Sequence, residues 1–200
     1  MKILVTGAAG FIGHYVAHAL LARGDSVVGI DNLNSYYDVA LKKARLCRIA
    51  KSKNFQFICT NIADSNSMLK LVEEHPQIEC IVHLAAQAGV RYSLDNPFAY
   101  IEANIMGQMV VLELCRALKD LKHFVYASSS SVYGGNTKVP FAVEDKTDTP
   151  ISLYAATKRA DELMGHCYSH LFKVPSTGLR FFTVYGPWGR PDMAAYLFTK

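Results

Sequence analysis

The sequence predicts a doubly wound α/β fold, in which helices cover both faces of a parallel sheet. Short and almost continuously apolar runs alternate with longer segments of helical period, and strands that are buried on both faces have this composition. The alternation repeats along almost the whole chain of 200 residues, which is typical of the doubly wound class. A glycine-rich turn also joins the first apolar run to the first helical segment, as in many folds of this class.

The predicted strands are six short apolar runs, most of them rich in β-branched residues: Lys2–Thr6, Ser26–Ile30, Phe55–Cys59, Cys80–Leu84, His123–Ser128 and Thr177–Phe181. The predicted helices lie between them, at Phe11–Arg23, about Val39–Ala50, Met68–Glu74, Phe98–Leu118 and Leu153–Phe172. Most connections are short. The long connection Gly134–Ser152 is polar and contains Pro140 and Pro150, so we expect a surface loop beside a functional site.

The composition excludes several classes of protein. Half of the residues are apolar and 19% are charged, with 21 basic against 17 acidic residues and a net charge of +4. This balance excludes intrinsic disorder and is too mild to indicate nucleic-acid binding, although it suits a small anionic ligand. The uncharged stretch Ile3–Ala22 is interrupted by glycine and histidine residues, so we expect no membrane span.

The cysteine and histidine residues predict no metal site. The five cysteines are far apart and form no C-x-x-C pair, so we expect reduced thiols in a cytoplasmic protein. His14 and His18, and likewise His166 and His170, are four residues apart but lack the glutamate of a zinc-binding H-E-x-x-H motif. We therefore expect packing or surface roles for these histidines.

The glycine-rich turn has the spacing of a dinucleotide site. Gly7, Gly10 and Gly13 stand three residues apart, where glycine permits a tight turn and places a pyrophosphate at the helix N-terminus. Asp31 ends the second predicted strand, as expected of an acid that binds the adenosine ribose. The next residue is Asn32 rather than a basic residue, which favours NAD over NADP. The alternatives are an ordinary glycine-rich turn and a solvated aspartate.

A second group of polar residues follows the fifth predicted strand. The serines Ser128–Ser131 come where the strand ends, and ligands of doubly wound sheets bind at the carboxyl ends of the strands. Tyr154 and Lys158 are four residues apart, so they share one face of a helix. A free phenol is a poor base near neutral pH, but a neighbouring ammonium favours the phenolate. Alternatively, the serines form a flexible polar loop and the Tyr–Lys spacing arises by chance.

Taken together, these motifs resemble the extended short-chain dehydrogenase/reductases, the NAD-dependent epimerase/dehydratase family of Rossmann-like enzymes. The resemblance is carried by Thr6–Gly13, Asp31-Asn32, His83–Ala86, Asn104, the serine run, Tyr154-x-x-x-Lys158 and Leu179–Phe182. Three further segments are similar to the UDP-glucuronate 4-epimerase branch, namely Gln87–Arg91, Ser128–Gly134 and Tyr185–Ala194. One departure is Asn61, where the family usually has aspartate facing the adenine.

The resemblance implies roles for individual residues. Tyr154 is implied as the general acid/base, Lys158 as a second catalytic residue that holds the nicotinamide ribose, and Ser129 as the hydrogen-bond partner of the reacting sugar oxygen. The implied NAD-binding residues are Gly7, Gly10, Phe11, Ile12, Gly13, Asp31, Asn32, Asn61, Ile62, Leu84, Ala85, Ala86, Asn104, Tyr154, Lys158 and Phe181. The expected substrate-binding residues are Gln87, Arg91, Ser129, Ser130, Ser131, Thr183 and Arg190; they supply hydroxyls and guanidinium groups for a sugar carboxylate.

The activity implied is NAD-dependent 4-epimerisation of UDP-glucuronate to UDP-galacturonate through a transient 4-keto sugar. UDP-glucuronate decarboxylation, UDP-hexose 4-epimerisation and a non-catalytic NAD-binding module remain alternatives. The resemblance also implies a homodimer through helices 98–118 and 153–172. We expect residues 1–180 to form the NAD-binding domain and residues 181–200 to begin a substrate-binding lobe. Most of that lobe is expected to be missing from this chain, so that these 200 residues alone turn over little substrate.

Overall fold

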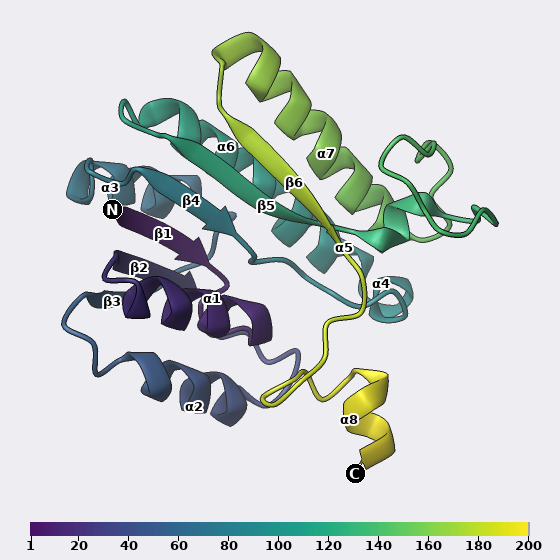
Figure 1. Cartoon of the computed structure of the whole chain (residues 1–200), viewed down its shortest axis with the longest axis horizontal. Helices are drawn as coiled ribbons and strands as arrows, with labels where there is room; N and C mark the ends of the chain where they lie inside the picture. Colours follow the sequence, from purple (N-terminus) through teal and green to yellow (C-terminus); the bar gives the residue numbers. More distant parts are fainter. Residues whose placement is uncertain (200) are drawn as a thin grey trace.

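The computed structural model describes residues 1–199 and contains one parallel sheet of six strands in the order β3-β2-β1-β4-β5-β6 (Figure 1). The strands are β1 (Lys2–Thr6), β2 (Ser26–Asp31), β3 (Phe55–Cys59), β4 (Cys80–His83), β5 (His123–Ser129) and β6 (Ser176–Phe181). The predicted fold class is confirmed, and each predicted strand is present with ends that differ by at most one residue. The strand order reverses between β1 and β4, which creates the crevice where doubly wound folds bind ligands.

Helices cover both faces of the sheet (Figure 1). On one face lie α1 (Phe11–Ala22) and α2 (Val39–Ile49), and on the other lie α3 (Ser65–Glu74), α6 (Gly107–Ala117) and α7 (Leu153–Phe172). The side chains of β1 alternate between two cores, with Ile3 and Val5 in the cluster of α1 and α2, and Leu4 in the cluster of α3 and α6. Because successive strand residues point to opposite faces, one apolar strand serves both cores.

The long helix predicted at Phe98–Leu118 is three segments in the structure. A short helix α5 (Pro97–Tyr100) leads into a π-helical segment η1 (Ile101–Met106), and α6 follows directly. The wider π turn directs Asn104 into the interior, where it is 1% exposed. Apolar periodicity does not reveal such an insertion, which is common near functional sites.

Helix α3 and three short helices also differ from the sequence prediction. Helix α3 begins three residues earlier than predicted because the Asp64 side chain accepts hydrogen bonds from the first-turn N–H groups of Asn66 and Ser67. An aspartate at this position stabilises a helix start. The sequence did not predict the short helices α4 (Tyr92–Asp95), η2 (Ser130–Tyr133) and α8 (Ala194–Thr199).

The helical stretch Pro97–Ala117 is long and apolar enough, by length and composition alone, to cross a membrane. Half of its apolar window is buried inside the fold, and Val111, Leu112 and Leu114 belong to the core. A core helix also has these properties. Within the described part of the chain, all five cysteines are free thiols, and no group of three or more metal-ligating side chains is found.

Candidate active site

A cavity of about 430 Å³ lies at the carboxyl ends of the strands. It extends from the glycine turn to the start of α7 and is lined by the ends of β1, β2, β4, β5 and β6 with their following loops. Most of the predicted cofactor residues line it: Gly7, Gly10, Phe11, Ile12, Gly13, Asp31, Asn32, Asn61, Ile62, Leu84, Ala85, Ala86, Tyr154, Lys158 and Phe181. The predicted substrate residues that line it are Gln87, Ser129, Ser130, Ser131, Thr183 and Arg190.

Two predicted site residues lie outside this cavity. Arg91 is exposed at the start of α4 and does not line it. Asn104 is buried behind the cavity wall, where its Oδ1 accepts from the Gln87 N–H at 2.8 Å and its Nδ2 donates to the Thr157 hydroxyl at 2.9 Å. Asn104 therefore joins η1 to the loop after β4 and to α7, and it supports cavity residues from behind.

The glycine turn is packed too tightly for any side chain at its key positions. A Cβ at Gly13 would lie 1.9 Å from the Gly7 carbonyl oxygen, and one at Gly10 would lie 2.9 Å from the same atom. Gly7 has a φ of +70°, which favours glycine. Helix α1 has no side-chain cap and no acidic residue in its first turn. Its N-terminal N–H groups and helix dipole are thus available to an anion, and the turn fits a pyrophosphate.

Asp31 is held in place by backbone donors. Its Oδ2 accepts from the Ala9 N–H at 3.1 Å and its Oδ1 accepts from the Leu33 N–H at 2.8 Å. Asp31 is 9% exposed and lines the cavity, and each carboxylate oxygen keeps lone pairs for hydroxyl donors. This arrangement fits a ribose diol. Asn61, the departure from the family pattern, donates through Nδ2 to Glu102 at 2.9 Å.

Thr6 ties the first strand to the loop after β4. Its hydroxyl oxygen accepts from the Leu84 and Ala85 N–H groups at 3.1 and 3.0 Å. With both lone pairs used, its proton is directed to His83 Nδ1 at 2.7 Å, so the neutral imidazole carries its proton on Nε2. Burial, with a smaller contribution from the charge of Lys158, lowers the pKa of His83 to about 3. His83 is therefore a neutral structural residue at this edge of the cavity.

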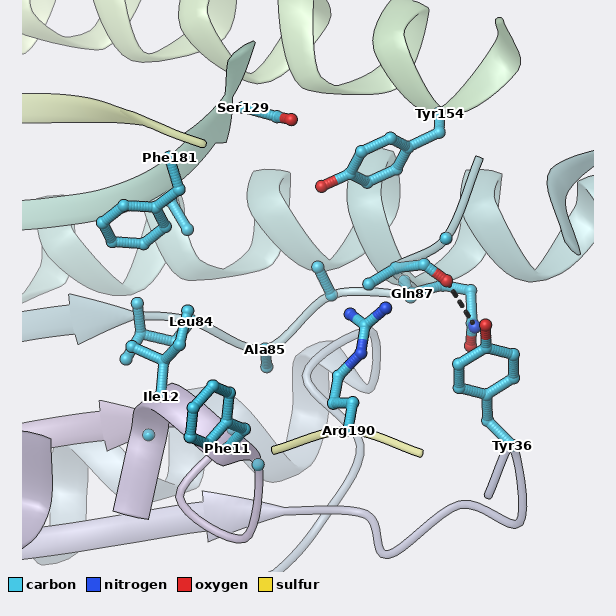
Figure 2. Close-up of a pocket in the computed structure, with 18 of the residues that line it drawn as sticks. Phe11, Ile12, Tyr36, Leu84, Ala85, Gln87, Ser129, Tyr154, Phe181 and Arg190 are labelled. Carbon is cyan, nitrogen blue, oxygen red and sulfur yellow. Dashed lines mark hydrogen bonds between the residues drawn. The ribbon is translucent and has the colours of Figure 1, made fainter. Parts of the chain in front are cut away.

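Tyr154 and Ser129 enter the cavity from different elements. Figure 2 shows the Tyr154 hydroxyl and the Ser129 side chain directed into the same space from the start of α7 and the end of β5. The Tyr154 ring packs edge-on against Tyr100, with centroids 6.1 Å apart. The Ser129 hydroxyl accepts from the Ser131 N–H at 3.1 Å. Both polar groups are therefore held by neighbours that leave their oxygens facing the cavity.

Lys158 lies one helical turn beyond Tyr154 and is 4% exposed. Its Nζ donates to the Ala127 carbonyl oxygen and to Asp161 Oδ2, both at 3.0 Å. Although burial opposes the charged form, the Asp161 carboxylate raises the pKa of Lys158 above its ordinary value. A permanent ammonium group therefore lines the cavity beside Tyr154.

Arg190 reaches the cavity from the opposite side. In Figure 2 its guanidinium group lies beside the Gln87 loop, on the side away from the Tyr154 ring. It already has an anionic partner, since Nε and Nη2 lie 3.0 and 2.7 Å from the two oxygens of Asp192. Tyr36 donates to Asp192 at 3.0 Å. A ligand carboxylate at Arg190 therefore shares the guanidinium group with Asp192.

Arg45 of α2 holds the segment that carries Arg190, and the sequence did not identify it. We call residues 186–193 the strap. The Arg45 side chain is fully buried and donates to the Trp188 carbonyl at 2.7 Å and to the Gly189 carbonyl at 3.1 Å. It also donates to the Ala9 carbonyl of the glycine turn at 3.2 Å. Trp188 has a φ of 64°, which is strained for a bulky residue and persists only where its surroundings fix it.

The sequence also missed several residues that line the cavity beside the Asp31 carboxylate. Lys42 donates to both oxygens of Asn34, at 2.8 and 2.7 Å, and is 5% exposed. Burial lowers the pKa of Lys42, while the charge of Asp31 opposes this effect. Tyr36 and Tyr37, in the loop that precedes α2, line the same part of the cavity. The aromatic pair in the loop after the second strand was the available sequence signal, but nothing in its spacing showed that this loop folds back over the crevice.

The fold and the cavity define a dinucleotide-binding domain of the short-chain dehydrogenase/reductase class. A parallel sheet, a glycine turn at its first strand, an aspartate at the end of the second, and a Tyr–Lys pair beside the cavity occur together here. A family profile described as GDP-mannose 4,6 dehydratase matches residues 4–199, and the chain belongs to this family. The family predicted from the sequence motifs is thereby confirmed.

The chain is similar to several proteins along its whole length. It is 54% identical to protein CapI of Staphylococcus aureus, covering 100% of this chain and 59% of that protein. It is 52% identical to the probable UDP-glucuronate 4-epimerase of Rhizobium meliloti, covering 99% and 58% respectively. The solved UDP-glucuronic acid 4-epimerase of Bacillus cereus, in complex with UDP-glucuronic acid and NAD, is 41% identical with a TM-score of 0.89, covering 98% of this chain and 61% of that one. The chain thus spans about three fifths of the length of these proteins.

Proposed function

We propose that this chain forms the cofactor-binding and catalytic part of an NAD-dependent UDP-glucuronate 4-epimerase. The observation that carries the proposal is one continuous cavity, with the glycine turn and Asp31 at one end and Ser129, Tyr154 and Lys158 at the other. A pure binding module has no need of the second group. The similarity to UDP-glucuronate 4-epimerases supports the choice of reaction.

The two ends of the cavity suit the two halves of NAD. The N-terminus of α1 would hold the pyrophosphate, Asp31 would accept hydrogen bonds from the adenosine ribose, and Lys158 would donate to the nicotinamide ribose. When bound, NAD would supply the acceptor for the hydride that leaves C4 of the sugar and the donor for its return, with no net change in the cofactor.

The chain's own residues move the proton. Tyr154 Oη takes the proton of the C4 hydroxyl and later returns it, so it acts first as base and then as acid. The Lys158 ammonium would stabilise negative charge that develops on the reacting oxygen atoms. The Ser129 hydroxyl hydrogen-bonds the same sugar oxygen and fixes its position relative to Tyr154.

A uronate requires a firm hold on its carboxylate. A ketone at C4 next to C5, which carries the carboxylate, makes a β-keto acid that can lose CO₂. We propose that the hydroxyls of Ser130, Ser131 and Thr183, together with the shared guanidinium group of Arg190, hold the carboxylate in a geometry that resists this loss. All four residues line the cavity. Hydroxyl and guanidinium donors are well suited to carboxylate oxygens.

The whole protein is proposed to extend this arrangement. We assign residues 1–180 to the NAD-binding domain and residues 181–200 to the start of the substrate-binding region. That region carries exposed aromatic residues, with Phe182 59% and Tyr185 78% exposed. The free thiols suit a reducing compartment such as the cytoplasm. We also propose a homodimer through helices 98–118 and 153–172.

Product analysis tests the reaction directly. The full-length natural protein is incubated with NAD and UDP-glucuronate, and the products are followed by NMR. We expect UDP-galacturonate. Release of CO₂ with a UDP-pentose would assign a decarboxylase instead, and conversion of neutral UDP-hexoses alone would assign a hexose epimerase. NAD binding without turnover of either sugar would leave a non-catalytic module.

A further inference from the structure

A buried ion pair lies directly behind the cavity on α7. Lys158 Nζ and Asp161 Oδ2 are 3.0 Å apart, and their side chains are 5% and 1% exposed. The proposed function uses Lys158 but assigns nothing to Asp161. Asp161 does not line the cavity, so any effect it has on bound molecules must pass through its partner.

The hydrogen bonds of Lys158 leave one donor free. An ammonium group has three N–H donors. One is used by the Ala127 carbonyl and a second by Asp161. The three N–H groups of an ammonium point in tetrahedral directions. The hydrogen bonds to Ala127 and Asp161 therefore also fix the direction of the third N–H. Lys158 lines the cavity, so the third N–H is the donor available to a bound molecule.

We propose that Asp161 is a positioning residue that keeps Lys158 protonated and directs its remaining N–H into the cofactor cavity. This inference rests on the proposed function for the identity of the cofactor. Asp161 itself touches neither cofactor nor substrate. It acts by supplying the negative charge and the acceptor that a fully buried ammonium group lacks elsewhere.

A purely stabilising role for the pair does not fit its geometry. Buried ion pairs contribute little net stability unless further hydrogen bonds satisfy both partners. Asp161 Oδ1 is buried and has no hydrogen-bond partner among residues 1–199. Burial outweighs the attraction of Lys158 and raises the pKa of Asp161 to about 6. Keeping this carboxylate ionised therefore costs free energy. Such a cost is expected where the role of the carboxylate is to hold the neighbouring Lys158 ammonium.

The other groups around the pair do not replace Asp161. From β4, His83 is neutral because burial, with a smaller contribution from Lys158, lowers its pKa to about 3. From β5, Tyr126 is a buried phenol whose pKa burial raises to about 12, so it too is neutral. On α7 itself, Glu162 is paired with Arg180 at 2.9 Å and with Arg159 at 2.9 Å.

From α6, the side chain opposite Asp161 is uncharged. Asn104 contacts Thr157 and Glu113 contacts Tyr168, so η1 and α6 run parallel to α7. From this register we infer that Gln108 lies at the level of Asp161. Within the described residues, Asp161 is the only carboxylate in contact with Lys158.

The sign of the expected pH effect follows from this arrangement. With Asp161 ionised, the Lys158 pKa is raised, so the ammonium persists through the alkaline range. Without that charge, burial is opposed only by the smaller effect of Tyr154 on the same helix, and the pKa of Lys158 is lowered. The ammonium, and with it the contact to the cofactor, is then lost as pH rises through the lowered pKa. Below about pH 6, where Asp161 takes up a proton, the natural protein and an uncharged variant should behave alike.

Lysine NMR tests the proposal without any sugar substrate. The full-length protein is labelled with ¹⁵N-lysine, the Lys158 Nζ signal is assigned with Lys158→Arg, and its titration is compared between the natural protein and Asp161→Asn. We expect the substitution to lower the Lys158 pKa by at least one pH unit. Calorimetry should show NAD affinity little changed at pH 6 and reduced roughly tenfold one pH unit above the lowered Lys158 pKa that NMR measures, since one pH unit corresponds to a factor of ten. Glu162→Gln is the matched control, and it should leave the Lys158 pKa in place.

Three results would overturn the proposal. These are an unchanged Lys158 pKa in folded Asp161→Asn, a loss of NAD affinity that is equal at both pH values, or an equal pKa shift in Glu162→Gln. If Asp161→Asn does not fold, the natural protein still decides: its Lys158 signal should respond near pH 6 and keep its proton to pH 9, and deprotonation below pH 9 contradicts the proposal. Failure of UDP-glucuronate turnover alone would refute the epimerase function and leave these measurements standing.

Discussion

The hydroxyl of Tyr154 is the residue-scale feature on which the proposed chemistry depends. Tyr154→Phe removes the proton acceptor but keeps the ring that packs against Tyr100. We expect turnover of UDP-glucuronate to fall by about 10²–10⁴-fold, the usual contribution of a general acid/base, with NAD affinity nearly unchanged. Steady-state kinetics and calorimetry measure the two effects.

Tyr168→Phe provides the matched control for Tyr154→Phe. It makes the same change on the same helix, where the hydroxyl donates to Glu113 away from the cavity. Turnover should stay close to that of the natural protein. More than a tenth of the natural activity in Tyr154→Phe would show that another group carries the proton.

At this scale the sequence predicted those residues whose role depends on local spacing. The glycines of the turn, Asp31, and the Tyr154–Lys158 pair all appear as short motifs, and all line the cavity. Arg45 has no such signal, because its partners Trp188 and Gly189 lie 143 and 144 residues further along the chain. Asp161 was likewise not predicted, because an aspartate on a helix is expected to face solvent when only the sequence is known.

At the scale of elements, strands were predicted better than helices for a physical reason. A strand buried on both faces is a continuous apolar run with sharp ends, so the ends of each strand agree to within one residue. The π-helical turn of η1 adds one residue to a helical turn without changing the apolar composition. The sequence therefore showed one long helix, and the inward placement of Asn104 emerged only from the structure.

At this scale, the strap is a segment whose attachment to the domain a single substitution can remove. Arg45→Met removes donors to two strap carbonyls and to the glycine turn, and the strained Trp188 backbone is then free to relax. We expect the KM for UDP-glucuronate to rise about tenfold with a smaller change in kcat, since Arg190 loses its fixed position. We also expect the free energy of unfolding to fall by about 1.5–3 kcal/mol, the usual contribution of a hydrogen bond from a charged donor.

Arg48→Met is the control for the strap. Arg48 stacks over the Trp188 ring, with its guanidinium carbon 5.0 Å from the ring centroid, but it is exposed and makes no hydrogen bond to the strap carbonyls in the described structure. Its removal should change KM and stability much less than Arg45→Met. Equal effects of the two substitutions would show that stacking, and not the buried hydrogen bonds, holds the strap.

At the scale of the whole molecule, part of the exposed apolar surface lies on the helices proposed for the dimer. Phe98 of α5 is 82% exposed, Ile101 of η1 is 47% exposed and Leu163 of α7 is 52% exposed. Burial of such side chains is worth about 1.5–3 kcal/mol each, and helix pairs from two copies can pack face to face.

Sedimentation velocity of the full-length protein at micromolar concentration should therefore show a dimer. Leu163→Glu should raise the dimer dissociation constant at least tenfold, whereas Val143→Glu, at a 77% exposed apolar residue in the loop before α7, should not. A protein that sediments only as a monomer would exclude the dimer and leave this apolar face for another part of the molecule.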